Sequence, residues 1–298
     1  MSRRVRGRAA PFGVAAVTLL TDFGVDDVYV GAMKGVILST EPRARIVDLT
    51  HGILPQDVRQ GGVRWASAVG SFPPGTVHVA VVDPGVGSER RIVALRAHGY
   101  RFLAPDNGLL GFIATRAEID EAVSVEEPRF WLPKVSRTFH GRDIIAPVAA
   151  RLAGGLRLSA LGPPVRDVLR IPVPVPTRRP ATTGQQIFGE IVDIDHYGNC
   201  LTNLSGPARG ELLEIRVGRR SFKLVLHSYA EARRGAPLAI VGSGGFLEIA
   251  VSQGNAARVL GLRIGQGVRA LCVDASQDSS LDVSKLGVRG RSRPRRPR

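Results

Sequence analysis

The sequence predicts an α/β N-terminal domain with a largely parallel sheet, followed by a smaller all-β domain of the barrel type. In the first half, short apolar runs alternate with stretches of helical periodicity, which is typical of a parallel sheet with crossover helices. Prolines then cluster between residues 163 and 183. Beyond them, short strand-like runs follow one another between glycine turns.

The elements of the first domain are justified by their periodicity. Strands are expected where apolar and β-branched residues form short runs, and helices where apolar residues recur at 3.6-residue spacing. The expected strands are 14–20, 45–49, 76–82, 92–97 and 100–103, and the expected helices are 29–38, 57–69 and 143–152. The second domain is expected to contain strands at 189–194, 212–217, 221–226, 238–241, 246–251 and 268–273.

These elements set the expected domain boundaries, since 298 residues leave room for two domains. We predict a disordered basic tail over 1–12, the α/β domain over 13–165, a Pro-rich linker over 166–185, the β-barrel domain over 186–275 and a second disordered basic tail over 276–298.

The net charge of +15 comes mostly from the two tails. Their arginines lack acidic neighbours and could bind nucleic acid or an anionic membrane, but a solvated extension without a function is the preferred interpretation. The rest of the chain shows no alternation of basic and aromatic residues, so nucleic acid is not expected as a partner. No apolar run is long enough to span a membrane, and 14–20 is short enough for a buried strand rather than a signal peptide. We expect a cytoplasmic protein.

Metal binding is not expected either. Cys200 and Cys272 lie in no CxxC or Cys/His cluster. The chain also lacks the cysteine density of a disulfide scaffold.

Two short turns supply candidate catalytic groups. One contains Asp83 and Arg90, and the other, Thr138–Asp143, contains His140. Together they provide an acid, a base and a cation in Gly-rich or Pro-rich turns beside apolar runs, where catalytic groups often lie. Taken alone, neither turn identifies a reaction.

Further polar residues end strands or form turns. Asp22 follows the first strand, where a carboxylate can accept hydrogen bonds from a ribose diol or simply cap a turn. His51 follows the second strand and could be functional, but a histidine at the end of a strand more often satisfies backbone groups than takes part in catalysis. Asp195 and Asn199 flank a turn and could recognise an amino-acid head group or a purine edge, or form an ordinary Asx turn. The loop around Ser243 could hold a carboxylate through backbone N–H groups or be a flexible hairpin.

In their order along the chain, these motifs resemble the S-adenosylmethionine hydroxide adenosyltransferase family, also called S-adenosylmethionine hydrolases, which are related to fluorinating and chlorinating enzymes. The similarity extends from about Val17 to about Leu262. It is carried by TDFG at 21–24, GAMKGVI at 31–37, IVDLTHGI at 46–53, FPPGTVHVAVVDPGVGS at 72–88, APDNGLL at 104–110, TFHGRD at 138–143, GNCLTN at 198–203 and GFLEIA at 245–250.

The resemblance implies hydrolysis of S-adenosyl-L-methionine to adenosine and L-methionine without a cofactor. It also implies a homotrimer, with each site between the first domain of one subunit and the second domain of its neighbour. The catalytic set would be Asp83, Arg90 and His140, which orient a water. The substrate-binding residues would be Asp22, Thr138, Phe139, Asp195, Asn199 and Ser243. The chain departs from the family pattern at Gly242 and Gly244, on either side of Ser243.

Two other functions compete with hydrolysis. A halide-dependent synthase of adenosyl halides is disfavoured by Asp83, since a carboxylate repels an incoming anion. The related halogenating enzymes carry a Tyr or Gly at that position and an extra loop. A non-catalytic adenosine-binding or S-adenosylmethionine-binding protein on the same fold is an alternative that the sequence does not exclude.

Overall fold

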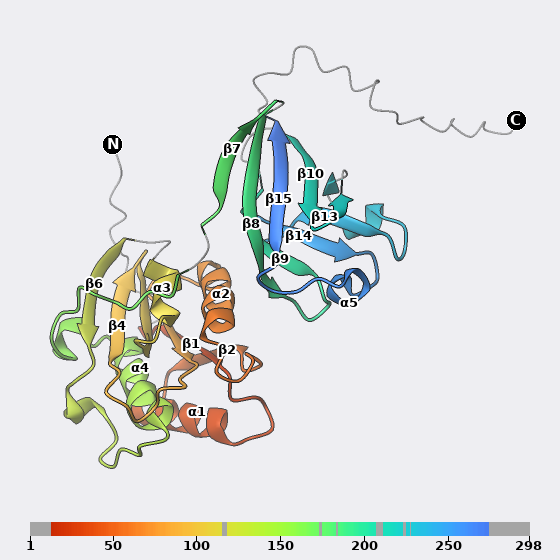
Figure 1. Ribbon diagram of the computed structural model, residues 1–298. Coiled ribbons are helices and arrows are strands. Elements are labelled where there is room, and N and C mark those ends of the chain that lie inside the picture. The colour runs from red at the N-terminus through yellow and green to blue at the C-terminus, as the bar shows by residue number, and fades with distance from the viewer. Residues whose placement is uncertain are drawn as a thin grey trace, which may run out of the picture. The chain divides into compact units, whose positions relative to one another are not determined.

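The computed structural model describes residues 13–114, 118–172, 175–182, 184–206, 211–222, 225–226 and 228–273. The predicted basic tails 1–12 and 276–298 lie outside this range. The chain divides into two compact units, Met1–Val173 and Pro174–Arg298, each with its own core (Figure 1).

The first unit is built on a six-stranded sheet in the order β2-β1-β3-β5-β4-β6. Strands β2, β1, β3 and β5 are parallel, whereas β4 is antiparallel to both β5 and β6. The predicted α/β class with a largely parallel sheet is therefore confirmed. The strands are β1 (Ala16–Thr21), β2 (Arg45–Thr50), β3 (Val77–Val81), β4 (Ile92–Ala97), β5 (Tyr100–Pro105) and β6 (Ile119–Ser124).

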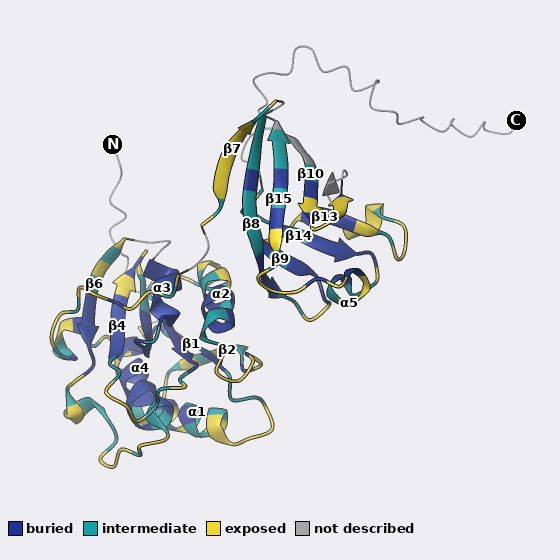
Figure 2. Ribbon diagram, viewed as in Figure 1, coloured by how far each residue is buried: buried dark blue, intermediate teal, exposed yellow. Residues whose placement is uncertain are grey.

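Helices cover both faces of this sheet, which explains why its central strands are buried runs rather than alternating ones. All five residues of β3 are buried. Strand β4 is likewise buried over most of its length (Figure 2). On one face, α1 (Tyr29–Thr40) and α4 (Ala146–Ala153) pack together, and Met33 and Ile37 of α1 join the core. On the other face, α2 (Val58–Ala68) and α3 (Leu109–Ala114) pack around Trp65.

The path of the chain creates a switch point between β1 and β3. From β1 the chain passes through α1 to β2 on one side, then through α2 to β3 on the other side of β1. Because the two crossover helices lie on opposite faces, they leave a crevice at the carboxyl ends of β1 and β3, where open α/β sheets bind ligands. Thr21 at the end of β1 pairs with Val81 at the end of β3.

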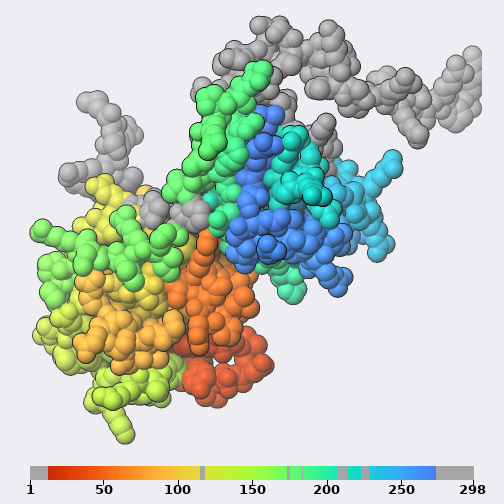
Figure 3. Space-filling view, viewed as in Figure 1, coloured from red at the N-terminus to blue at the C-terminus, as the bar shows by residue number. Residues whose placement is uncertain are grey.

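The second unit is a nearly closed barrel of mostly antiparallel strands in the order β11-β10-β15-β8-β9-β14-β13-β12, with β7 beside β8. The predicted all-β second domain is confirmed. Along one side of the unit, β7 and β8 form a ridge next to β15 (Figure 3). The strands are β7 (Thr177–Ala181), β8 (Gly184–Ile194), β9 (Cys200–Ser205), β10 (Glu211–Val217), β11 (Arg220–Phe222), β12 (Val225–Leu226), β13 (Pro237–Val241), β14 (Phe246–Val251) and β15 (Gly267–Val273), and α5 (Ala256–Leu260) follows β14.

The segment predicted as a linker, 166–185, differs from that prediction. It contains β7 and the first residues of β8, because the backbone of β7 pairs with β8 along its whole length. Pro180 is tolerated because β7 is an edge strand, where a missing N–H costs no ladder bond. Strands β6 and β9 and helices α3 and α5 were not predicted. The two helices, of 6 and 5 residues, are too short to show a helical period, and the two strands mix polar and apolar residues.

No helix in the described part of the chain is long and apolar enough to cross a membrane.

His78, on β3, is a fully buried histidine away from the crevice. Its Nδ1 lies 2.8 Å from the Thr18 hydroxyl, and the ring packs among Phe72, Tyr100 and Phe102. Among the described residues, its Nε2 has no hydrogen-bond partner. Burial therefore lowers the pKa of His78 to about 4.

This pKa predicts a loss of stability in acid. His78 takes up a proton near pH 6.5 in the unfolded chain but only near pH 4 in the folded chain. Its neutral, buried form therefore contributes fully to the free energy of unfolding above pH 6.5, and this contribution falls as the pH is lowered towards 4. About 3 kcal/mol should be lost between pH 6.5 and 4. Urea unfolding followed by tryptophan fluorescence reports on the first unit, which contains both Trp65 and Trp131. His78→Asn should be less stable than wild type at pH 7, and the gap should close by pH 4. A difference in stability between the two proteins that stayed constant from pH 7 to pH 4 would contradict the lowered pKa of His78.

Candidate active site

Two acidic residues meet at the switch point because their strands are neighbours. Asp22 directly follows β1, and Asp83 comes two residues after β3. Both line a cavity of about 400 Å³, within the range of small-molecule sites. Phe23, Tyr29 and Phe139 form one wall, with ring centroids 5.3–5.8 Å apart. The remaining lining residues are Pro55, Gln56, Val81, Pro84, Val86, Thr138, His140 and Gly141.

The structure joins Asp83, Arg90 and His140 into one hydrogen-bonded chain. Arg90 Nε lies 2.8 Å and 2.9 Å from the two Asp83 carboxylate oxygens, and its Nη2 also contacts Oδ2. The same Nη2 lies 3.0 Å from His140 Nδ1. Both members of the ion pair are largely shielded, with side chains 10% and 6% exposed for Arg90 and Asp83. The guanidinium thus fixes the carboxylate and the imidazole together at the cavity.

The ends of the segment that carries Asp83 and Arg90 are held by the turn after β5. Asn107 Nδ2 donates to the carbonyl of Val82, 2.7 Å away. Asp106 accepts hydrogen bonds from the side chain of Arg91, at 2.6 Å from Nη2. This turn thus anchors the residues that flank Asp83 and Arg90.

Thr138, Phe139 and His140 are placed by a buried carboxylate beneath them. Asp143 is fully buried and accepts the backbone N–H of Ser136 at 2.8 Å. The hydroxyl of Ser136 in turn lies 3.1 Å from that of Thr138. Burial disfavours the charged form of Asp143, but hydrogen bonds from Arg142 and Ser136 outweigh it and lower its pKa.

Asp22 is held by a residue that the sequence did not single out. The backbone N–H of Gln56 donates to Asp22 Oδ2 at 2.8 Å. Gln56 adopts φ 67°, a left-handed conformation that is costly for a residue with a Cβ and is often retained at functional sites. No residue type in the sequence marks this position, because glutamine has no preference for that conformation.

His51 lies outside the cavity lining. Its Nδ1 lies 2.9 Å from the Thr21 hydroxyl and its Nε2 lies 3.1 Å from an Asp48 oxygen. Asp48 also accepts a hydrogen bond from Lys34 at 2.6 Å. His51 was expected to satisfy backbone groups, but its ring instead contacts two side chains, that of Thr21 at the end of β1 and that of Asp48 in β2.

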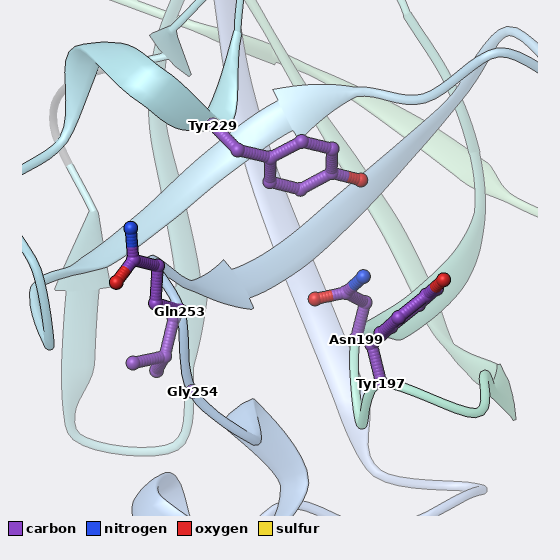
Figure 4. A pocket seen from close by; sticks show the side chains of 6 residues that line it. Tyr197, Asn199, Tyr229, Gln253 and Gly254 are labelled. Atoms are coloured by element: carbon purple, nitrogen blue, oxygen red, sulfur yellow. The ribbon is translucent and has the colours of Figure 1, made fainter.

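The second unit carries a pocket of its own, of about 460 Å³, and Asn199 lines it. Tyr229 lies on one side and Tyr197 and Asn199 on the other (Figure 4). Asp195 holds Asn199 through both carboxylate oxygens, at 2.8 Å from its backbone N and 2.9 Å from Nδ2. These bonds span four positions, so they close a wider turn than an Asx turn, in which the side chain bonds the backbone two residues on. Asn199 also lines the pocket. Gln253 and Gly254 close the pocket and, like Tyr229, were not predicted.

The hydroxyl of Tyr229, a lining residue of this pocket, donates to Glu248 at 2.9 Å. Burial and the nearby carboxylate raise the pKa of Tyr229 to about 12. Burial also raises the pKa of Glu248, and Asp195 adds to this effect.

Ser243 is exposed at the tip of the β13–β14 hairpin and does not line this pocket, so its role stays a prediction. At Gly242, a Cβ would lie 1.7 Å from Glu248 Oε1, so a larger residue there would require the Glu248 side chain to move.

Family models match both units. The model of the SAM hydroxide adenosyltransferase N-terminal domain matches residues 17–162, and that of the C-terminal domain matches residues 189–269. The chain belongs to this family.

Relatives of known name match over most of the chain. An (R)-S-adenosyl-L-methionine hydrolase from Salinispora arenicola is 39% identical over 259 residues, covering 85% of this chain and 96% of the relative. The protein of the same name from Thermus thermophilus is also 39% identical, covering 86% and 99%. A fluorinase from an Actinoplanes species is 29% identical, covering 85% and 96%.

A solved structure has the same fold. The crystal structure of an uncharacterized conserved protein from Thermotoga maritima superposes with a TM-score of 0.79 at 34% identity, covering 85% of this chain and 99% of that one. The resemblance inferred from the motifs is therefore confirmed at the level of the family.

Gly87 should be essential to the turn that carries the catalytic candidates. Its φ is 81°, and a Cβ there would lie 2.4 Å from the carbonyl oxygen of Arg137. Gly87→Ala should therefore destabilise the first unit by roughly 1–3 kcal/mol. Gly85→Ala is the matched control, because a Cβ there meets nothing closer than 3.4 Å. Urea unfolding followed by tryptophan fluorescence compares the two variants. Equal stabilities would show that the turn does not depend on this close approach.

Proposed function

We propose that this protein hydrolyses S-adenosyl-L-methionine to adenosine and L-methionine by attack of water on ribose C5′. The observation that carries the proposal is the Asp83–Arg90–His140 chain, set beside Asp22 in one cavity at the switch point. Relatives named as hydrolases of the (R) diastereomer are 32–41% identical across most of the chain, which supports the same substrate and diastereomer here.

The chemistry of the leaving group suits these residues. The sulfonium departs as a neutral thioether, so it needs neither a general acid nor a metal to neutralise it. The attacking water is the weaker partner and needs orientation and a proton acceptor. Asp83 and His140 line the cavity where such a water would lie, and Asp22 can accept hydrogen bonds from the ribose hydroxyls.

Halide-dependent synthesis is the weaker candidate. A carboxylate at position 83 repels an incoming anion. The fluorinase relatives are also more distant, at 27–29% identity.

We further propose that the complete site forms between neighbouring copies in a homotrimer. Each unit has its own pocket, and exposed apolar residues accompany both. Val25, Val28 and Leu54 are exposed in segments that adjoin cavity-lining residues of the first unit, and Tyr197 of the second pocket is 73% exposed. Burial of such residues commonly drives association. A cytoplasmic location agrees with the low cysteine content, since Cys200 and Cys272 are the two cysteines of the sequence.

Product analysis tests the activity. Incubation with S-adenosyl-L-methionine should release adenosine and methionine in equal amounts, with and without a chelator. Added chloride or fluoride should yield no adenosyl halide. Asp83→Ala should reduce turnover by roughly 10²-fold or more. The proposal would be wrong if substrate bound without turnover, if a halide product formed, or if a chelator abolished activity and zinc or magnesium restored it.

Complementation tests the shared site. Asp22→Asn damages the part of the site contributed by the first unit, and Asn199→Ala damages the part contributed by the second unit. When the two variants are mixed and reassembled, some sites combine an intact first unit with an intact second unit, so the oligomers should regain activity. Asp22→Asn mixed with Asp83→Asn is the matched control and should stay inactive, because every first-unit half is then defective. If the first mixture also stayed inactive while subunit exchange was demonstrated independently, each site would lie within one chain.

A further inference from the structure

The position of Arg90 between Asp83 and His140 restricts the imidazole. The side chain of Arg90 contacts both partners, and its Nη2 lies 3.0 Å from His140 Nδ1. A guanidinium stays protonated and has donors only, so it cannot accept a hydrogen bond. Nδ1 of His140 must therefore present its lone pair to Arg90.

The protonation state of the ring follows from its surroundings. Burial lowers the pKa of His140, and the positive charge of Arg90 lowers it further. The carboxylates of Asp83 and Asp143 act in the opposite direction but do not reverse the shift. His140 is thus neutral at physiological pH. A neutral imidazole carries one N–H, and with Nδ1 unprotonated that hydrogen is on Nε2.

We infer that His140 is a hydrogen-bond donor to the attacking oxygen, and that Asp83 rather than His140 takes the proton of the water. The inference rests on the proposed hydrolysis. His140 lines the cavity while its Nδ1 faces Arg90, which leaves Nε2–H as the group it offers to a ligand. A ring with a proton on one nitrogen and a hydrogen bond on the other has no lone pair left for a water proton.

The reaction balances with these assignments. The water oxygen forms the bond to C5′, and the C5′–S bond breaks with its electron pair going to sulfur, which becomes the neutral thioether of methionine. One water proton moves to a carboxylate lone pair of Asp83, which later releases it to solvent. Arg90 keeps its charge throughout. The Nε2–H of His140 stabilises negative charge on the oxygen as its proton leaves.

Two substitutions separate a donor from a base. The amide nitrogen of Gln reaches about as far as Nε2 of His and can donate, but it has no basicity near neutral pH. His140→Ala should lower kcat by roughly 10²–10³-fold, whereas His140→Gln should stay within about tenfold of wild type. Equal losses in the two variants would overturn the inference, because a missing base harms both alike.

The tautomer can be measured without turnover. In the full chain labelled with ¹⁵N-histidine, the His140 signals are assigned by their disappearance in His140→Gln. Near pH 7.5, Nε2 should carry the directly bonded proton and Nδ1 should show the shift of an unprotonated nitrogen. A protonated Nδ1 would overturn the inference. A wild-type protein that releases no adenosine would instead refute the proposed hydrolysis and leave this tautomer result standing.

Discussion

Parallel pairing of β1 with β3 is the constraint on which the candidate site depends. It places the two strands at the ordinary spacing of neighbours in a sheet, about 4.7–4.9 Å, so that the residues after their carboxyl ends enter one crevice. Asp22 and Asp83 are more than 60 positions apart in the sequence but share this edge. The remaining site residues come from turns attached to that frame.

The turns are fixed by polar contacts more than by apolar packing. Arg90 joins the 83–90 segment to His140, and Asp143 supports the turn that carries His140. Polar contacts of this kind are directional, so they hold side chains in particular orientations at moderate energetic gain. This suits a site whose chemistry requires a water at a defined angle to C5′.

Much of the fold was predictable because its cause is local. Buried parallel strands such as β3 are short runs rich in β-branched residues, and Asp22 and Asp83 are conspicuous because they follow such runs. What could not be predicted depends on tertiary contacts. The left-handed Gln56 is held by its surroundings, and the proton position on His140 depends on a contact between residues 50 positions apart. Likewise, Pro180 resembles a linker residue until β8 is seen to pair with its strand.

That edge strand also bears on solubility. In the described part of the chain β7 pairs only with β8, so its outer edge offers backbone groups to which another chain could add a strand. Arg178 and Arg179 place charge along this edge, and Pro180 removes one N–H from it. Charged residues and proline are the usual means by which natural sheets avoid edge-to-edge aggregation. The residues that resembled a linker are therefore of the types that discourage a further chain from pairing with this edge.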